Sequence, residues 1–424
     1  MTAEIWIRDL PAAGTPRFVT LAAHRLWLLD NARALFDFFQ RPAFNPAGGF
    51  FSLDADARPL PPKPGHKGAD RQVHATARMA HAFAIAHLLG LPGADRVVDH
   101  GVAFLWERMR DRQHGGYFWG VDDEKPTDPT KQAYGHAFVL LAASSAVCVA
   151  HPDARRLLED VTQVLEDKFW DKAAGASREE FNPDWSPIGA YRGQNSNMHL
   201  AEALMAAFEA TGERAYLDKA ESIAALIIDR HARAEGWRVA EHFNEAWQVD
   251  RAYKGDPMFR PSGTTPGHAL EWSRLLVQLW ELGGRSKPWM IEAAAELFRK
   301  TVAIGWDRTL GGFYYTLDWD DQPAQTDRYW WPLAEGIGAA AALGSVDSDP
   351  SYEEWYRRIW SFLVAHVIDR VRGWQPELDN ALNPVSRVFE GRPDIYHAVQ
   401  ACLIPLFPVD GSLTWQLKRG GFKL

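Results

Sequence analysis

Hydrophobic positions along the chain follow two different helical patterns. From Leu157 to Phe169, within residues 153–171, apolar side chains recur every three or four positions and charged ones fill the rest. This spacing predicts an amphipathic outer helix with one buried face. Residues 197–212 and 331–344 are small and apolar almost all round, as expected of helices in an inner layer. The two patterns together predict an all-α protein with an inner and an outer layer of helices.

Six short polar stretches separate these helical segments. Five of them place a glycine directly before an aromatic residue, and the third has Ala176 and Ser177 at the aromatic position. A glycine bend followed by aromatic and polar residues predicts a short hairpin or ordered loop. Corresponding positions recur every 60 to 76 residues, which indicates a repeated supersecondary unit. The stretches are residues 45–59, 112–126, 171–185, 233–247, 308–323 and 370–384.

Each repeat therefore consists of a loop, an inner helix, a turn and an outer helix. Six such helix pairs predict an (α/α)6 barrel, a single catalytic domain over residues 1–424 with its hairpin loops at one end. An open solenoid of the same pairs is the alternative. Terminal repeats with the polar outer face that a solenoid needs are not evident, so we favour the barrel.

Charge and cysteine usage exclude several classes of protein. The net charge is −9 with both signs interspersed, and no basic stripe suggests nucleic acid. No run of about 18 apolar residues predicts a membrane span. The first residues lack a basic start followed by an apolar run, so we expect no signal peptide. Cys148 and Cys402 lie in apolar helical segments, which suits a reducing compartment and predicts a cytoplasmic protein.

Aromatic content is the unusual feature of the composition. The chain has 19 Trp, 22 Phe and 11 Tyr. Aromatic rings often only fill a core, but they also pack on the C–H face of a sugar ring. Trp119, Trp331 and Tyr396 are candidates for such stacking.

The barrel predicts that the first turns of the inner helices surround one pocket. Each predicted inner helix carries a polar residue between 19 and 31 residues after the aromatic position of its loop. The fourth interval is the longest because residues 251–266 are inserted there. The ring consists of Arg71, His136, His199, His268, Glu335 and His397.

Three of these histidines have polar neighbours at helical spacing. A carboxylate beside an imidazole can fix its tautomer and tune its pKa for acid–base work at neutral pH. A lone histidine on an apolar helix is more often a satisfied core residue, but recurrence in register favours a pocket. The pairs are Asn195 with His199, Glu271 with His268, and Asp394 with His397.

Metal binding is an alternative use of the histidines. The chain has no H-E-x-x-H sequence and no paired cysteine motif. Three histidines from separate helices could in principle hold zinc. We favour a site without metal or cofactor, in which Arg71 faces substrate hydroxyls or an enediolate.

Four motifs carry a resemblance to a known family. In order they are RQVHATARMAHAFA (71–84), NSNMHLAEALMAAFEATGE (195–213), TPGHALEWSRLL (265–276) and RPDIYHAVQACL (392–403). Together they resemble the N-acylglucosamine 2-epimerase superfamily of sugar epimerases and isomerases. The likeness runs from about Arg33 to the last helix and covers nearly the whole chain. The resemblance implies an (α/α)6 barrel, in agreement with the repeat.

The resemblance also implies an activity. Members interconvert sugars at C2, or between C1 and C2, without a metal. The motifs look closest to the aldose–ketose isomerase branch, which implies conversion of D-mannose to D-fructose through a cis-enediol. A 2-epimerase of the N-acylglucosamine, mannose/glucose or cellobiose type is the alternative. An inverting glycosidase needs two carboxylates but no histidine ring, so we favour it less. The expected partner is a monosaccharide, and a homo-oligomer is left open.

Residue roles follow from the matching motifs. The resemblance implies that His268 and His397 form the acid–base pair. It implies further that His199 and Asn195 contact substrate, that Arg71 binds hydroxyls or the enediolate, that Glu271 partners a catalytic histidine, and that Arg260 lies in the pocket. Glu335 and His136 join the expected binding residues from the ring of polar groups, and Trp331 joins them as a stacking candidate.

Overall fold

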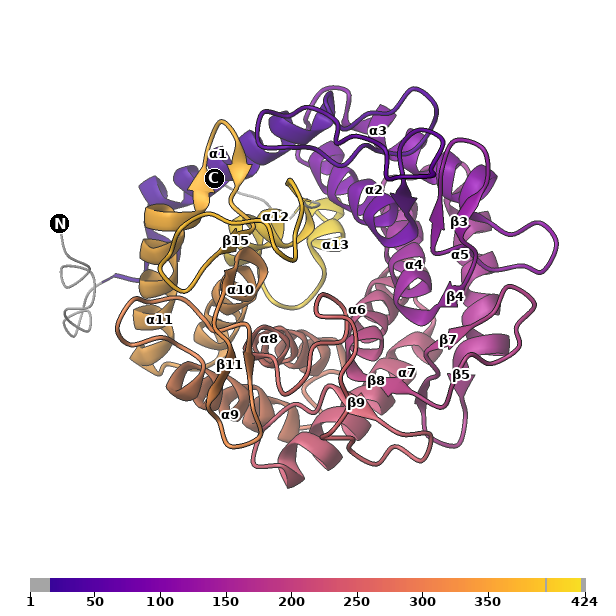
Figure 1. Ribbon diagram of the computed structural model, residues 1–424. Helices are drawn as coiled ribbons and strands as arrows, with labels where there is room; N and C mark the ends of the chain where they lie inside the picture. The colour runs from indigo at the N-terminus through magenta and orange to yellow at the C-terminus, as the bar shows by residue number, and fades with distance from the viewer. Residues whose placement is uncertain (1–15, 393–394, 421–424) are drawn as a thin grey trace.

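Six inner helices stand around a common axis in the computed structural model, which describes residues 16–392 and 395–420 (Figure 1). Each inner helix packs against the next, and the last contacts the first. The closed ring confirms the predicted (α/α)6 barrel and excludes the open solenoid. The inner helices are α2 (Val73–Leu88), α4 (Ala133–Cys148), α6 (Gln194–Thr211), α8 (Pro266–Leu282), α10 (Trp330–Val346) and α12 (Tyr396–Leu403).

A second layer of helices covers the ring from outside. α1 packs on α12, and each later outer helix packs on the inner helix before it. Four outer helices continue into a π-helical turn: η3 (Leu105–Met109), η4 (Leu165–Phe169), η5 (Ala225–Ala232) and η6 (Leu363–Val367). The outer helices are α1 (Ala22–Gln40), α3 (Ala94–Phe104), α5 (Ala154–Val164), α7 (Arg214–Ala224), α9 (Trp289–Ile304) and α11 (Pro350–Phe362).

Burial follows the two hydrophobic patterns of the sequence. In α4 every residue except Val147 is buried. In α5 the buried residues are Ala154, Leu157, Leu158 and Val161, which lie on one face. An inner helix has protein on all sides, whereas an outer helix keeps a charged face in solvent.

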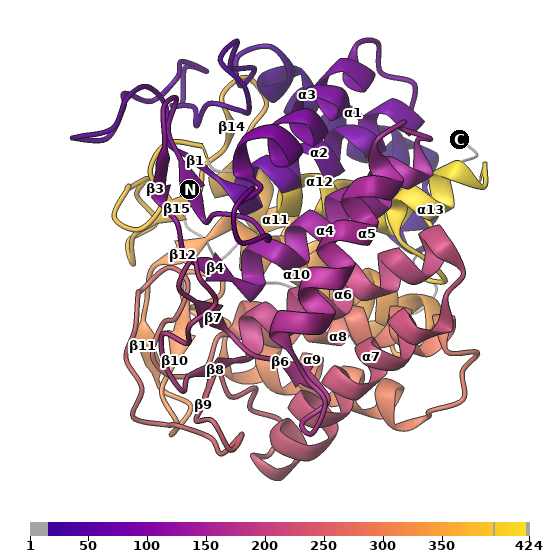
Figure 2. The same cartoon turned by 90° about the vertical axis from the view of Figure 1, so that its right-hand side faces the viewer.

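Short antiparallel strands gather at one end of the barrel (Figure 2). They form the hairpins predicted from the glycine–aromatic stretches, together with pairings between neighbouring repeats. The strands are β1 (Arg71–Gln72), β2 (Gly120–Val121), β3 (Pro126–Asp128), β4 (Lys131–Gln132), β5 (Trp170–Asp171), β6 (Ala176–Ser177), β7 (Glu180–Phe181), β8 (Arg192–Gly193), β9 (His242–Phe243), β10 (Thr316–Leu317), β11 (Pro323–Gln325), β12 (Arg328–Tyr329), β13 (Ile368–Asp369), β14 (Gly373–Trp374) and β15 (Glu377–Leu378).

Pairing between repeats holds the start of each inner helix. The segment before an inner helix pairs with the hairpin that follows the next outer helix, as Arg71 pairs with Val121 before α2. A bridge between Leu53 and Arg392 joins the first loop to the segment before α12 and closes the circle. All six inner helices therefore begin at the same end of the barrel.

The opposite end is covered by the C-terminal helix α13 (Leu413–Lys418), which contacts α2, α4 and α6. Cys148 and Cys402 are free and buried, as expected. Within the described parts of the chain, no helix is both long and apolar enough to cross a membrane. The polar residues at the starts of the inner helices lie at the hairpin end, because all six inner helices begin there.

Candidate active site

A cavity of about 360 Å³ opens at the hairpin end of the barrel. Its volume falls within the range of about 300–1,000 Å³ that is typical of small-molecule sites. All six inner helices contribute to it through their first turns. The helix residues that line it include Arg78, Tyr134, Asn195, His199, His268, Glu271, Trp331 and His397.

His268, in the first turn of α8, is held by a buried carboxylate. Its Nδ1 lies 2.9 Å from both carboxylate oxygens of Glu241. Gln194 donates to Glu241 Oε2 at 2.8 Å and accepts a hydrogen bond from the Trp272 indole. Burial opposes ionisation of Glu241, but the imidazole and the Gln194 amide lower its pKa below the ordinary value. Because Nδ1 is engaged, proton exchange with a substrate would use Nε2 of His268.

His397, in the first turn of α12, has a second histidine–carboxylate pair. Its Nδ1 lies 2.8 Å from Glu335 Oε1. Arg274 donates from Nε to the other oxygen of Glu335 at 3.0 Å. Burial again opposes ionisation, but Arg274 and His397 together lower the pKa of Glu335. Both histidines are thus oriented by an ionised glutamate, and both line one cavity.

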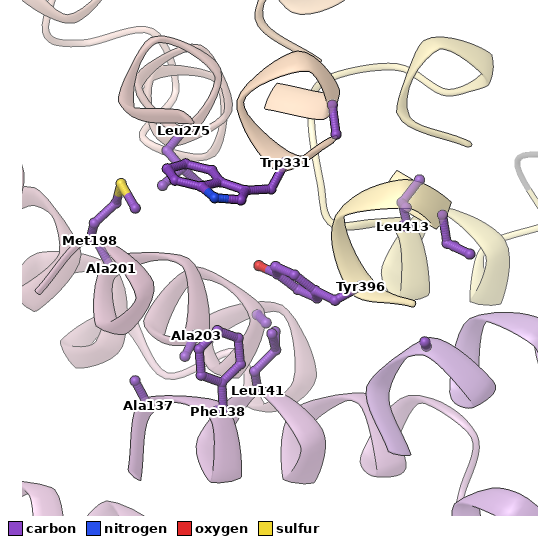
Figure 3. Close-up of a cluster of buried hydrophobic side chains, with 14 of the residues drawn as sticks. Ala137, Phe138, Leu141, Met198, Ala201, Ala203, Leu275, Trp331, Tyr396 and Leu413 are labelled. Atoms are coloured by element: carbon purple, nitrogen blue, oxygen red, sulfur yellow. The ribbon is translucent and has the colours of Figure 1, made fainter. Parts of the chain in front are cut away.

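Trp331 lies between the two histidines. Its ring centroid is 5.0 Å from that of His268 and 5.8 Å from that of His397. Figure 3 shows Trp331 and Tyr396 extending from α10 and α12 toward the middle of the ring. A Cβ on Gly267 would lie 2.3 Å from the Trp331 ring. Gly267 is therefore needed where α8 and Trp331 meet beside His268.

Arg78 places a positive charge in the lining of the cavity. Its side chain is buried and donates to the Tyr134 hydroxyl at 2.7 Å. The guanidinium lies 4.1 Å from the Phe138 ring centroid and 4.8 Å from that of Tyr396. A buried arginine stacked on aromatic rings presents a fixed positive charge to a bound oxyanion.

Between the histidine pairs lie two groups whose neutral forms are favoured by burial. Burial and nearby Arg78 together lower the pKa of His199 to about 3, although the Glu202 carboxylate opposes them. Burial and the neighbouring Glu335 raise the pKa of Glu271 well above its ordinary value. His199 Nδ1 lies 3.5 Å from Glu271 Oε1. A protonated Glu271 can donate a hydrogen bond to a sugar oxygen, as an ionised carboxylate cannot.

Two clusters of the described residues bring ligand atoms close enough for a metal ion. They are His199, Glu202 and Glu271, and Glu271, Glu335 and His397. Arg274 reaches Glu335 at 3.0 Å, Glu202 at 3.3 Å and Glu271 at 3.7 Å. The guanidinium therefore already places a positive charge beside the carboxyl groups of both clusters. These residues therefore suit the Arg274 guanidinium already present better than a bound metal ion.

His136 does not line the cavity, contrary to the expectation from its register. Its Nδ1 lies 2.7 Å from the Gln132 carbonyl oxygen, and its Nε2 accepts from the Tyr117 backbone N–H at 3.0 Å. Two positions earlier on α4, Tyr134 faces the cavity instead. Residues two apart on a helix point about 200° away from each other, so only one of them can face the axis.

Of three further expected binding residues, two lie outside the cavity lining and one lies in it. Arg260 lies outside the cavity lining, because it pairs with Glu180 at 2.8 Å and stacks on Tyr191. Glu335 lies behind His397 rather than in the cavity wall. Arg71 does line the cavity, but it donates to the Gly48 carbonyl and pairs with Asp123. Arg78, on α2, is a second buried arginine in the cavity lining.

The partner expected for His268 was also wrong. Glu271 shares its helix and lines the cavity, but the carboxylate on His268 belongs to Glu241, which precedes β9. Asp394 lies outside the described residues. Asn195 lines the cavity as expected, and its buried Oδ1 has no hydrogen-bond partner within the described ranges.

The sequence matches a known protein family over most of its length. The family model described as N-acylglucosamine 2-epimerase matches residues 48–401. The D-mannose isomerase of Thermobifida fusca is 43% identical over 408 residues, which cover 94% of this chain and 98% of that protein. The D-mannose isomerase of Pseudomonas cannabina pv. alisalensis is 42% identical over 401 residues, which cover 92% of this chain and 94% of that protein.

Solved structures give a matching result. A crystal structure of a D-mannose isomerase aligns with a TM-score of 0.83 and 32% identity, covering 94% of this chain and 99% of that chain. The cellobiose 2-epimerase from Bacillus thermoamylovorans B4167 aligns with a TM-score of 0.79 and 19% identity, covering 91% of this chain and 99% of that chain. At the lower identity, the likeness concerns the fold.

Proposed function

We propose that this chain, which belongs to the N-acylglucosamine 2-epimerase family and is an isomerase, interconverts D-mannose and D-fructose. His268 and His397 are the proposed acid–base pair. One observation carries the assignment of residues. Two histidines, each with Nδ1 on a buried glutamate, line the same cavity of about 360 Å³. Relatives named as D-mannose isomerases that match over most of the chain support the substrate.

The reaction moves two protons in the open-chain sugar. A histidine removes the proton from C2 while a proton is supplied to O1, which converts the aldehyde into a cis-enediol. Return of a proton to C1 and loss of the proton on O2 then give the ketose. A C2–H bond is broken, a C1–H bond is formed, and one hydroxyl proton moves from O2 to O1. A base of near-neutral pKa within reach of both carbons is therefore the essential group.

Developing negative charge on O1 and O2 needs donors that are already in place. Arg78 supplies a fixed cation beneath the cavity, and Glu271 in its protonated form supplies an O–H donor. The inner helices begin at this end, so the positive ends of their dipoles also face the sugar. Each of these contributions is stronger for the enediolate than for the neutral substrate, as catalysis requires.

The walls of the cavity favour a monosaccharide. Trp331 offers a ring face next to both histidines, on which the apolar side of the carbon chain can pack. Asn195 presents an unpaired buried carbonyl oxygen to a sugar hydroxyl. The free, buried thiols of Cys148 and Cys402 favour a reducing cytoplasm as the place of reaction.

A 2-epimerase is the second candidate, because the two histidines come from different helices. α8 and α12 both contact α10, whose Trp331 lies between His268 and His397. If the two imidazoles meet opposite faces of C2, the second can return a proton with inverted configuration. The product would then be glucose rather than fructose.

One assay separates the candidates. Purified protein is incubated with D-mannose, D-glucose, cellobiose and a p-nitrophenyl mannoside, and the products are resolved by chromatography. We expect fructose from mannose, with little glucose and no released nitrophenol. Glucose as the main early product would favour the epimerase. Nitrophenol release would point to a glycosidase, and no product from any sugar would overturn the assignment.

A further inference from the structure

The two histidine–glutamate pairs differ in what lies behind the carboxylate. Behind His268, the Glu241 carboxylate accepts a hydrogen bond from the neutral amide of Gln194. Behind His397, the Glu335 carboxylate accepts from the Arg274 guanidinium. The first glutamate therefore keeps its full negative charge for its histidine, whereas the second shares it with a cation.

Arg274 occupies a site built for its side chain. It is buried on α8, 5% exposed, and does not line the substrate cavity. Besides Glu335, it lies 3.3 Å from Glu202 and 3.7 Å from Glu271. A Cβ on Gly338 of α10 would lie 2.8 Å from Arg274 Cδ, so the glycine makes room for the arginine stem.

The position of Arg274 has an electrostatic consequence for His397. An opposite charge within about 4–6 Å typically shifts a pKa by 1–3 units, and a like charge shifts it the other way. Arg274 offsets the negative charge of Glu335, which would otherwise attract a proton to His397. Removal of Arg274 must therefore make protonated His397 more stable.

We propose that Arg274 is a positioning residue of the isomerase that holds Glu335 in place while keeping His397 in its neutral, proton-accepting form. This inference rests on the proposed function, because it assigns His397 the task of taking a proton from the sugar. Arg274 itself touches neither the cavity nor the substrate; it acts through Glu335.

Other titratable and charged groups face the same region and affect the outcome of the experiment. Their protonation can partly compensate a lost arginine, so the test must follow His397 directly. On α8 they are His268 and Glu271, on α6 His199 and Glu202, on α2 Arg78, on α10 Glu335, and on α12 Tyr396.

The first test is the pH dependence of kcat/KM for mannose in three variants. Arg274→Met removes the charge, Arg274→Gln keeps one donor without the charge, and Arg274→Lys keeps the charge. We expect the acidic limb of the profile to move up by about one pH unit or more in the Met and Gln variants, because His397 then holds its proton to higher pH. Arg274→Lys should restore the wild-type limb.

The second test does not depend on turnover. Imidazole resonances of histidine-labelled protein are titrated by NMR, and the His397 signal is assigned from the His397→Asn spectrum. His397 should titrate at higher pH in Arg274→Met or Arg274→Gln than in wild type, and at the wild-type pH in Arg274→Lys. This result would stand even if mannose proved to be the wrong substrate, so the two proposals can fail separately.

A control variant measures the effect of losing a buried arginine that lies away from His397. Arg328 is 2% exposed, pairs with Asp307 in a hairpin and does not line the cavity. Arg328→Met should lower the melting temperature without moving the acidic limb. The proposal is overturned if His397 titrates at the same pH with and without the Arg274 charge, or if Arg274→Gln lowers kcat/KM equally at every pH. If Arg274→Met does not fold, Arg274→Gln alone is used for both the pH profile and the NMR titration.

Discussion

His136 and His268 occupy corresponding places in two repeats, yet their surroundings differ. Each lies in the first turn of an inner helix, and each has Nδ1 against an oxygen, the Gln132 carbonyl for His136 and the Glu241 carboxylate for His268. The Nε2 of His136 accepts from the Tyr117 backbone N–H. His268 instead lines the cavity, where its Nε2 can reach a substrate.

The second ring nitrogen therefore decides what each histidine does. Burial lowers the pKa of His136 to about 3, so it remains neutral and serves as a fixed hydrogen-bond acceptor for a hairpin. His268 combines the same fixed tautomer with access to the cavity and an ionised partner. The position in the repeat places both histidines at the start of an inner helix, and the groups around each imidazole determine whether it can exchange a proton with a substrate.

The largest expected effect comes from removing either cavity histidine. His268→Asn and His397→Asn should each lower kcat by about 10²–10⁴-fold, the usual contribution of a general acid or base. The double variant should be little worse than the poorer single variant, because groups that act as one unit are not additive. Steady-state kinetics with mannose provide the measurement. Wild-type turnover in either single variant would remove that histidine from the mechanism.

A smaller loss is expected when the partner of His268 is neutralised. Glu241→Gln replaces a charged hydrogen bond, worth about 1.5–3 kcal/mol, which corresponds to a loss of about 10- to 150-fold in kcat. The effect should fall on kcat rather than KM, because Glu241 orients the imidazole and does not line the cavity. Glu271→Gln, which alters the carboxyl group originally assigned to His268, is the matched comparison. An unchanged kcat in Glu241→Gln would mean that His268 needs no carboxylate.

His136→Asn should affect stability rather than turnover. The change leaves the Tyr117 N–H without its acceptor, and an unsatisfied buried group costs about 1–3 kcal/mol. Denaturant unfolding and kcat are measured on the same preparation. A loss of turnover as large as that of His268→Asn would break the distinction between the two histidines.

Metal removal should have the smallest effect of all. Arg274 already contacts every carboxylate of the two clusters whose geometry could suit an ion. Dialysis against EDTA should leave both kcat and the melting temperature unchanged. Stoichiometric zinc together with chelator-sensitive turnover would contradict this prediction. It would indicate that His199 or His397 is a metal ligand.

The fold could be predicted from the sequence because its signals are local. Helix amphipathicity separates the two layers, and the hairpins carry their own turn chemistry. Asp111 and Asp307, for example, each accept hydrogen bonds from the backbone N–H groups two and three residues later, just before a glycine pair. Such turns form wherever the sequence recurs, so the period indicates the six helix pairs, and the absence of polar terminal repeats favours a closed barrel over a solenoid.

The site was less predictable because its partners are distant in sequence. Spacing from a loop gives the height of a residue along the barrel but not the direction of its side chain, so it picked out His136, which faces away from the cavity, and missed Arg78, which lines it. Glu241 lies 27 positions before His268, and Glu335 lies 62 before His397. Proximity along a helix suggested Glu271 instead. The signals that could have helped were the second arginine in the first motif and the glycine before His268.

The fate of the C2 hydrogen tests the central claim most directly. Mannose is converted in D₂O, and the fructose formed at early conversion is examined by NMR for deuterium at C1. Because a proton resting on a cavity imidazole can exchange with solvent before it is returned, the account predicts deuterium in part of the C1 positions. Fructose without deuterium at C1 at any stage of the reaction, the result expected of a hydride shift from C2 to C1, would contradict the account.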